Sequence, residues 1–267
     1  MAPVIHLVRH AQGYHNLNHE NEQLPDPDLT PFGEEQCRNL RDAFPDHDKI
    51  THLVASPLRR TVYTCLHSFE PVVKKGIKVI ALPDAQEMSL QPCDHGSDVE
   101  KIKAEFGEKV DFSRVQDGWN IKSPESKYYP DPAKLDARAR DTRRSLRELA
   151  KSHGDDAQIV LVTHGGIVHF VTGDWAGIPK GGATGWKNTE CRSYEFKDPS
   201  GADPEAALQE LESSWEQRRG SQAALTETEN REMRDILQKM LEAENAADME
   251  ARAKAKAKAE GEADKAQ

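Results

Sequence analysis

The sequence contains no apolar run long enough to cross a bilayer and no recognisable secretory signal. A membrane-spanning helix needs about 20 consecutive apolar residues, whereas the longest strongly apolar run here, residues 159–163, is followed at once by His164 and two glycines. The N-terminus leads directly into an apolar strand pattern, with neither a basic segment nor a small-residue cleavage site. We therefore expect no membrane insertion and a cytoplasmic location.

Cysteine is also scarce, and acidic residues outnumber basic ones. The four cysteines, Cys37, Cys65, Cys93 and Cys191, are far apart and form no C-x-x-C pair, which predicts free thiols. The eleven histidines include no H-E-x-x-H motif, so we predict neither a metal nor a cofactor. With 46 acidic against 36 basic residues the formal net charge is −10, which disfavours binding to nucleic acid. Any bound anion must therefore be held by a local group of cations.

The composition changes near residue 200 and predicts three segments. Residues 1–200 alternate short apolar runs with amphipathic stretches, and Pro and Gly lie between them, as in an α/β domain. Residues 201–245 are poor in Gly and β-branched residues and predict a helical extension. Residues 246–267 form a low-complexity tail, which we expect to be disordered because it lacks apolar area for a core.

The extension carries two apolar stripes at helical spacing. One stripe comprises Leu208, Leu211 and Trp215, and we expect its helix to pack on the α/β domain. The other stripe, within residues 233–241, either folds back onto the same chain or meets its counterpart in a homodimer. Both alternatives remain open from the sequence.

One pattern occurs three times: an apolar strand, a sharp turn with a charged or polar residue, and a helix. The strands are residues 4–8, 52–55 and 159–163. In an open α/β sheet the ligand crevice lies outside the carboxyl ends of the strands. If these strands are parallel neighbours, the residues that follow them converge, namely Arg9, His10, Arg59 and His164.

The second of these turns predicts an anion at a helix N-terminus. Ser56 suits the N-cap position and Pro57 the first helical position, so that Arg59 falls in the first turn. Cations there oppose the helix dipole by a few tenths to about 1 kcal/mol, and a bound anion would reverse this cost. The alternative is that Arg59 and Arg60 pair with surface carboxylates. A single histidine at a strand end is likewise weak evidence for catalysis.

Four segments together resemble a known family. They are LVRHAQGYHN at residues 7–16, the set Leu29, Thr30, Gly33 and Gln36, SPLRRTVYT at residues 56–64, and VTHGG at residues 162–166. In this order and spacing they resemble the histidine phosphatase superfamily, in its phosphoglycerate-mutase-like branch, over about residues 3–196. The resemblance implies a three-layer α/β/α sandwich with a mostly parallel central sheet. Two departures are Ala11, where glycine is usual, and Arg60, which we align with an alanine of the family's helix.

The resemblance also implies a reaction through a phosphohistidine, with cations around the transferred phosphoryl group. The implied set is His10 as the nucleophile, Arg9, Arg59, His164 and Asn16 as phosphate ligands, and Glu87 as the proton donor with Asp84 as the alternative. Arginine suits this task because its planar fork stays charged and binds phosphate through two donors. Histidine attacks only when it is neutral, with the proton of the other ring nitrogen held by an acceptor.

Three functions fit these residues. The first is a metal-independent phosphomonoesterase that acts on a small phosphorylated metabolite. The second is a phosphomutase, which needs a second group of cations, but residues 110–131 offer only Arg114, Lys122 and Lys127. The third is a non-catalytic scaffold that binds a phosphorylated ligand, although binding alone has no use for a nucleophile. Trp119 and the tyrosines at 128 and 129 either line a lid over the substrate or pack on the core.

Overall fold

The computed structural model describes residues 2–154, 156–178 and 184–265. Its strands form one seven-stranded sheet in the order β4-β3-β2-β5-β1-β6-β7. The strands are β1 (Val4–Arg9), β2 (His52–Ala55), β3 (Val79–Ala81), β4 (Val110–Asp111), β5 (Gln158–Thr163), β6 (Cys191–Phe196) and β7 (Leu208–Glu210). Strands β1 to β5 pair in parallel, whereas β6 and β7 pair antiparallel at one edge. The three strands predicted from the sequence are therefore neighbours, in the order β2-β5-β1.

Alternation along the central strands gives the sheet two apolar faces. Ile5 and Leu7 of β1 belong to one buried cluster, and Val8 belongs to the other. Strand β5 alternates in the same way and is buried from Ile159 to Thr163. Since successive side chains of a strand point to opposite faces, a run of consecutive apolar residues is what a sheet covered on both sides requires.

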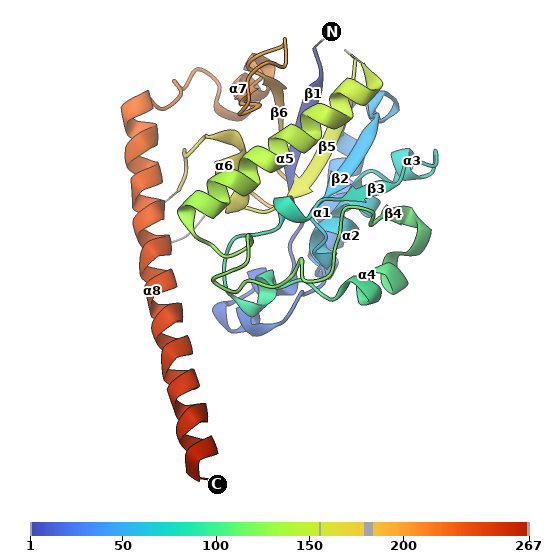
Figure 1. The fold of residues 1–267 in the computed structure, drawn as a ribbon. Helices are drawn as coiled ribbons and strands as arrows, with labels where there is room; N and C mark the ends of the chain where they lie inside the picture. Colours follow the sequence, from blue (N-terminus) through green and yellow to red (C-terminus); the bar gives the residue numbers. More distant parts are fainter. Residues whose placement is uncertain (1, 155, 179–183, 266–267) are drawn as a thin grey trace.

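Helices cover both faces, which confirms the predicted three-layer sandwich (Figure 1). One face carries α1 (Pro31–Ala43), α2 (Arg59–Ser68), α3 (Glu70–Val73) and α4 (Val99–Phe106), and the other carries α5 (Pro132–His153) and α6 (Ile167–Thr172). Short 3-10 helices occupy the connections, namely η1 (Tyr14–Asn16), η2 (His19–Gln23), η3 (His47–Lys49), η4 (Pro83–Ala85), η5 (Pro92–Asp94) and η6 (Gly107–Lys109).

The first stripe of the predicted extension is not a single helix. Leu208 lies in β7, where it pairs with Phe196 of β6, and helix α7 (Glu212–Arg219) begins only after this strand. The prediction of a helix from Leu208 was therefore wrong, because the open edge of β6 offers backbone partners that a local pattern cannot reveal. The sheet also continues past the change in composition at residue 200.

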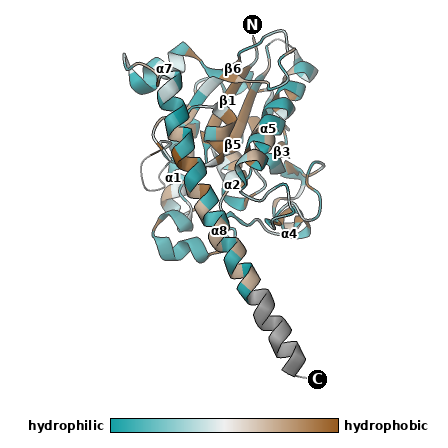
Figure 2. Ribbon diagram, turned by 60° about the vertical axis from the view of Figure 1, so that its left-hand side comes forward, coloured by the Kyte–Doolittle hydropathy of each residue, from teal (hydrophilic) through white to brown (hydrophobic). Residues whose placement is uncertain are grey.

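The last helix, α8 (Glu227–Lys265), includes most of the segment predicted to be disordered. Alanine, glutamate, lysine and arginine are strong helix formers, and Asp248 with Arg252 forms an i, i+4 ion pair. Leu237 and Leu241 are buried in the cluster formed by α5 and α6. The second stripe therefore packs in cis, where Figure 2 shows its apolar residues beside the domain.

Candidate functional site

The register of the central strands brings the predicted histidines together. Arg9 at the end of β1 pairs with Thr163 at the end of β5. The next residues along the two strands are His10 and His164, whose ring centroids lie 5.2 Å apart. The predicted convergence at the carboxyl edge of the sheet is confirmed for this pair.

His10 is held in the protonation state that a nucleophile needs. Its Nδ1 lies 2.7 Å from the carbonyl oxygen of Ala11, so Nδ1 carries the proton and donates it there. Nε2 therefore carries the lone pair. Burial, followed by the charges of Arg60, His15 and Arg9, holds the pKa of His10 well below its usual value, and the ring stays neutral near pH 7.

The segment containing Thr30, Gly33 and Gln36 braces the loop after His10. The Thr30 hydroxyl caps α1 by accepting from the Gly33 N–H, and it donates to the Gln12 side chain. The Gln36 side chain accepts from the Gln12 N–H at 2.8 Å. A Cβ at Gly33 would lie 2.1 Å from the Gln12 carbonyl oxygen, so only glycine allows this approach. Ala11 is fully buried and does not have a positive φ, so the departure from glycine causes no strain there.

Arg60, rather than Arg59, enters the site. Arg60 is only 1% exposed and lines the same pocket as His10, and its Nη2 lies 2.7 Å from Asp94 Oδ1. Arg59 points away from this pocket, and its guanidinium pairs with Asp28 and Glu105. The prediction that Arg59 converges on His10 is therefore corrected, and its alternative of surface ion pairs is the one observed.

Both the motif and the helix start explain the correction. In the motif S-x-L-x-R, the arginine stands four residues after the serine, so counting from Ser56 reaches Arg60. The alignment that gave this place to Arg59 was therefore wrong by one residue. The N-cap is Leu58 and not Ser56, and Arg59 is the first residue of α2. The buried carboxylate of Asp26 accepts from the Arg59 N–H at 3.0 Å. An aspartate of the protein thus satisfies the N-terminus at which we expected a bound anion.

His164 lies behind Arg60 and supports it. An arginine can only donate, so His164 Nδ1 accepts from Arg60 Nη2 at 3.1 Å. His164 Nε2 then donates to the Ser56 hydroxyl at 2.8 Å. Burial, together with the charge of Arg60, lowers the pKa of His164 well below its usual value. Both ring nitrogens are engaged, so in this structure His164 orients Arg60 and presents no free donor to the pocket.

Two guanidinium nitrogens near His10 are buried without a partner among the residues that the structure describes. They are Nε of Arg9 and Nε of Arg60. Arg9 also lines the pocket, and its Nη1 donates to the Trp186 carbonyl oxygen. Buried donors without a partner are rare in folded proteins. Unsatisfied cationic donors beside a neutral histidine are suited to bind an anion.

Glu87 lies in the pocket and caps the helix after His164. Its two carboxylate oxygens accept from the N–H groups of Gly166 and Ile167, each at 2.9 Å. A Cβ at Gly166 would come within 2.6 Å of Glu87 Oε1, so this glycine makes room for the carboxylate. Asp84, the alternative proton donor, pairs with Lys127 beside a different hollow. Of these two carboxyl groups, the structure therefore places Glu87 and not Asp84 in the pocket that contains His10.

The pocket is large, with a volume of about 1050 Å³. Asn16 lines it as predicted, and its side-chain oxygen accepts from the Gly13 N–H. His15 also lines it, 5.3 Å from His10 between ring centroids, and burial lowers its pKa to about 3. His15 was assigned no role from the sequence, because a single histidine within a short 3-10 helix gives no local signal. The aromatic residues considered for a lid do not line this pocket, and Trp119 and Tyr129 are buried.

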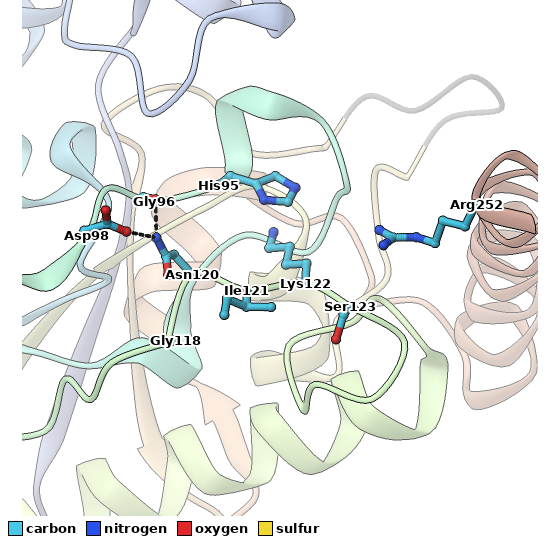
Figure 3. Close-up of a pocket in the computed structure, with 9 residues that line it drawn as sticks. All are labelled: His95, Gly96, Asp98, Gly118, Asn120, Ile121, Lys122, Ser123 and Arg252. Carbon is cyan, nitrogen blue, oxygen red and sulfur yellow. Dashed lines mark hydrogen bonds between the residues drawn. The ribbon is translucent and has the colours of Figure 1, made fainter. Parts of the chain in front are cut away.

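Lys122, considered from the sequence only as a cation for a second phosphate, supports the segment that carries Glu87. Its ammonium group, on a residue only 2% exposed, donates to the carbonyl oxygens of Glu87 and Ser89, each at 2.7 Å. Burial lowers the pKa of Lys122 to about 7. Figure 3 shows Lys122 beside a separate hollow of about 430 Å³, into which Arg252 of α8 reaches from the other side.

The four cysteines are free, as predicted. Over the residues that the structure describes, no group of three or more histidine, cysteine and acidic side chains is arranged to hold a metal ion. No helix in the same residues is long and apolar enough to span a membrane.

Comparison with known proteins agrees with this geometry. A phosphoglycerate mutase-like protein of Arabidopsis thaliana is 27% identical over a 210-residue alignment that covers 62% of this chain and 72% of that protein. Phosphoglycerate mutase-like protein 2 of the same plant is 44% identical over 75 residues, which cover 24% and 22% of the two chains.

Two solved structures share the fold. Mycobacterial hydrolase 1 matches with a TM-score of 0.51 and 18% identity, over 79% of this chain and 97% of its own. The ecdysone phosphate phosphatase of Bombix mori matches with a TM-score of 0.52 and 12% identity, over 78% and 92%. A family model matches residues 5–202, most of the sheet and its helices. The chain therefore belongs to the histidine phosphatase superfamily (branch 1).

Proposed function

We propose that this protein is a metal-independent phosphomonoesterase that acts on a small phosphorylated metabolite through a phosphohistidine. The observation that carries the proposal is His10, a buried neutral imidazole with its proton held at Nδ1, beside unsatisfied donors of Arg9 and Arg60. Family membership supports the same reading.

In the first step, the lone pair of His10 Nε2 attacks phosphorus and the P–O bond to the leaving group breaks. The proton stays on Nδ1 and remains hydrogen-bonded to the Ala11 carbonyl oxygen, which stabilises the positive charge that the ring acquires. Arg9 and Arg60 bind the phosphoryl oxygens, over which the loose transition state spreads its negative charge. His164 keeps Arg60 in place.

Glu87 is the proposed carrier of protons. In its protonated form, the carboxyl group donates its proton to the leaving oxygen as the P–O bond breaks. The resulting carboxylate then takes a proton from the water that attacks the phosphohistidine. Inorganic phosphate leaves, and neutral His10 and protonated Glu87 are restored.

The distribution of cations favours hydrolysis over the phosphomutase reaction. A mutase must hold a second phosphate, but Arg114, Lys122 and Lys127 do not line the His10 pocket. Lys122 is bound to two carbonyl oxygens, and Lys127 pairs with Asp84. Release of inorganic phosphate in proportion to substrate consumed supports the esterase. Interconversion of 2- and 3-phosphoglycerate without phosphate release would support the mutase instead.

A quench experiment tests the mechanism. A ³²P-labelled phosphomonoester, mixed briefly with the enzyme and quenched in alkali, is expected to leave an alkali-stable, acid-labile label on His10. His10→Ala is expected to lose both label and turnover. His52→Gln, at a half-buried histidine of β2 outside the pocket, is the matched control and should keep both. Label on a serine, or full activity in His10→Ala, contradicts the proposal, and an absence of turnover with every phosphomonoester favours the non-catalytic scaffold.

A further inference from the structure

Helix α8 forms one wall of the pocket that contains His10. Five of its residues line that pocket, namely Leu237, Met240, Glu244, Ala247 and Asp248. Their spacing of three or four residues places them on a single face of the helix. A helix outside the family match at residues 5–202 therefore contributes directly to the site.

This wall is fixed to the domain along its length. Arg234 of α8 pairs with Asp136 of α5, and Asn230 accepts from the Trp175 N–H at 3.0 Å. Farther along, the Asn245 side chain donates to the Pro130 carbonyl oxygen at 3.0 Å, and the Tyr129 hydroxyl donates to Asp248 at 3.2 Å. These contacts lie on both sides of Glu244, so its position relative to the pocket is set by the fold.

The pocket is lined by groups of different chemistry. Its cationic groups, Arg9 and Arg60, lie beside His10. The wall from α8 adds Glu244 and the apolar Met240. Among the described residues Glu244 has no ion-pair partner, whereas Asp248 on the next turn pairs with Arg252. Partial burial raises the pKa of Glu244, so a cation beside it would stabilise its charged form.

Apolar side chains from other elements face the same space. Met88, Leu90 and Ile178 line the pocket together with Met240. The volume of about 1050 Å³ exceeds what a phosphate group needs and is at the upper end of sites for drug-sized ligands. The leaving group of the substrate is therefore expected to occupy this space.

We propose that α8 selects the substrate and that the leaving group is an apolar chain or ring bearing an ammonium group, which Glu244 recognises. This inference rests on the proposed phosphomonoesterase function and names its substrate class. A second anionic group on the substrate is disfavoured, because it would face the carboxylate of Glu244.

Matched substrates that differ only in charge test the recognition. The probes are ω-aminoalkyl phosphates of increasing chain length, each compared with the neutral n-alkyl phosphate of the same length and with the ω-carboxyalkyl phosphate. We expect kcat/KM to favour the amine over the neutral analogue by about fivefold at the best chain length, since an ion pair with an exposed carboxylate such as Glu244 is worth up to about 1 kcal/mol. The carboxylate analogue should be the poorest of the three.

Variants on α8 assign this preference to one residue. Glu244→Gln is expected to bring the ratio of amine to neutral substrate close to one, whereas Glu242→Gln, at an exposed position outside the pocket, should leave it unchanged. Hydrolysis of p-nitrophenyl phosphate by Glu242→Gln should equal that by the parent enzyme, and the ratio of amine to neutral substrate within each enzyme corrects for any general loss of activity. Equal ratios in Glu244→Gln and Glu242→Gln, or no preference in the parent enzyme, would overturn the inference while leaving the esterase function standing.

A second pair of variants tests the wall by its size. Ala247→Trp narrows the pocket from an exposed position, and Ala246→Trp places the same side chain outside it. Only Ala247→Trp is expected to lower kcat/KM for naphthyl phosphate, several-fold, with little effect on methyl phosphate. Equal effects of the two variants on naphthyl phosphate would show that α8 does not select the leaving group. A parent enzyme that hydrolyses none of the phosphomonoesters would instead refute the proposed phosphomonoesterase function.

Discussion

The sequence predicted Arg59 as a phosphate ligand, whereas the structure places Arg60 in the pocket. Substituting each of these two adjacent arginines in turn tests which of them binds the phosphate. Arg60→Met removes a guanidinium that is 1% exposed and bound to Asp94, His164 and the Cys93 carbonyl oxygen. Arg59→Met removes one that pairs with Asp28 and Glu105 outside the pocket. The two variants change the same atoms one residue apart, so each is the control for the other.

The expected magnitudes differ widely. Loss of one donor that stabilises transition-state charge costs about 10²- to 10³-fold in kcat, so Arg60→Met should lose at least that much. Breaking a buried ion pair from one side costs about 3–5 kcal/mol of unfolding free energy, and the lower end applies because Ser89 still donates to Asp94. Arg59→Met should change kcat/KM by less than about threefold and the unfolding free energy by about 0–1 kcal/mol, as for surface pairs.

Steady-state phosphate release and urea denaturation measure both quantities. The double variant Arg60→Met with Asp94→Asn removes the buried charge left behind, and it should recover part of the stability but none of the activity. Activity lost in Arg59→Met and kept in Arg60→Met would refute the structural assignment. Recovery of activity in the double variant would show that Arg60 acts only on stability.

Three further predictions concern metals, pH and the C-terminal helix. Activity should survive EDTA and be inhibited by vanadate, and a loss on chelation that a divalent ion restores would contradict a metal-independent site. Burial lowers the pKa of Lys122 from 10.5 to about 7, so between pH 7 and pH 10.5 the unfolded chain binds more protons than the folded chain and the unfolding free energy rises with pH. Lys122→Met should reduce this rise when the unfolding free energy is measured by urea denaturation at several pH values. An unchanged dependence on pH would contradict the low pKa of Lys122. A chain that stops after Gly220 loses the buried Leu237 and Leu241, each worth about 1.5–3 kcal/mol of unfolding free energy, so its melting temperature should fall by many degrees. A chain that stops after residue 254 keeps both leucines and should melt within a degree or two of the full chain. Equal melting temperatures of all three chains would show that α8 does not stabilise the domain.

The sequence by itself determined the elements that depend on neighbouring residues. The apolar runs of β1, β2 and β5 end in the turns that carry His10 and His164, and the structure pairs these strands as parallel neighbours. Strand periodicity and the residues that follow each strand are properties of short segments, so one sequence suffices to read them. The same local signals predicted an α/β domain with segments that Pro and Gly separate, and the resemblance to the histidine phosphatase superfamily implied its three layers.

Only the tertiary structure decided which polar groups meet in the site. The Arg60 guanidinium lies in the site because it donates hydrogen bonds to Asp94 and His164, which are distant in sequence. The Arg59 guanidinium lies outside the site because it pairs with Asp28 and Glu105. In the same way, Leu208 lies in a strand and not in the predicted helix because it pairs with β6. The contribution of α8 to the wall of the pocket also depends on how the helix packs on the domain. The free energy of these contacts depends on groups that the chain brings together only after folding. For Arg60 the sequence did hold a signal, because the motif S-x-L-x-R counted from Ser56 reaches it, whereas its partners Asp94 and His164 follow from no local pattern.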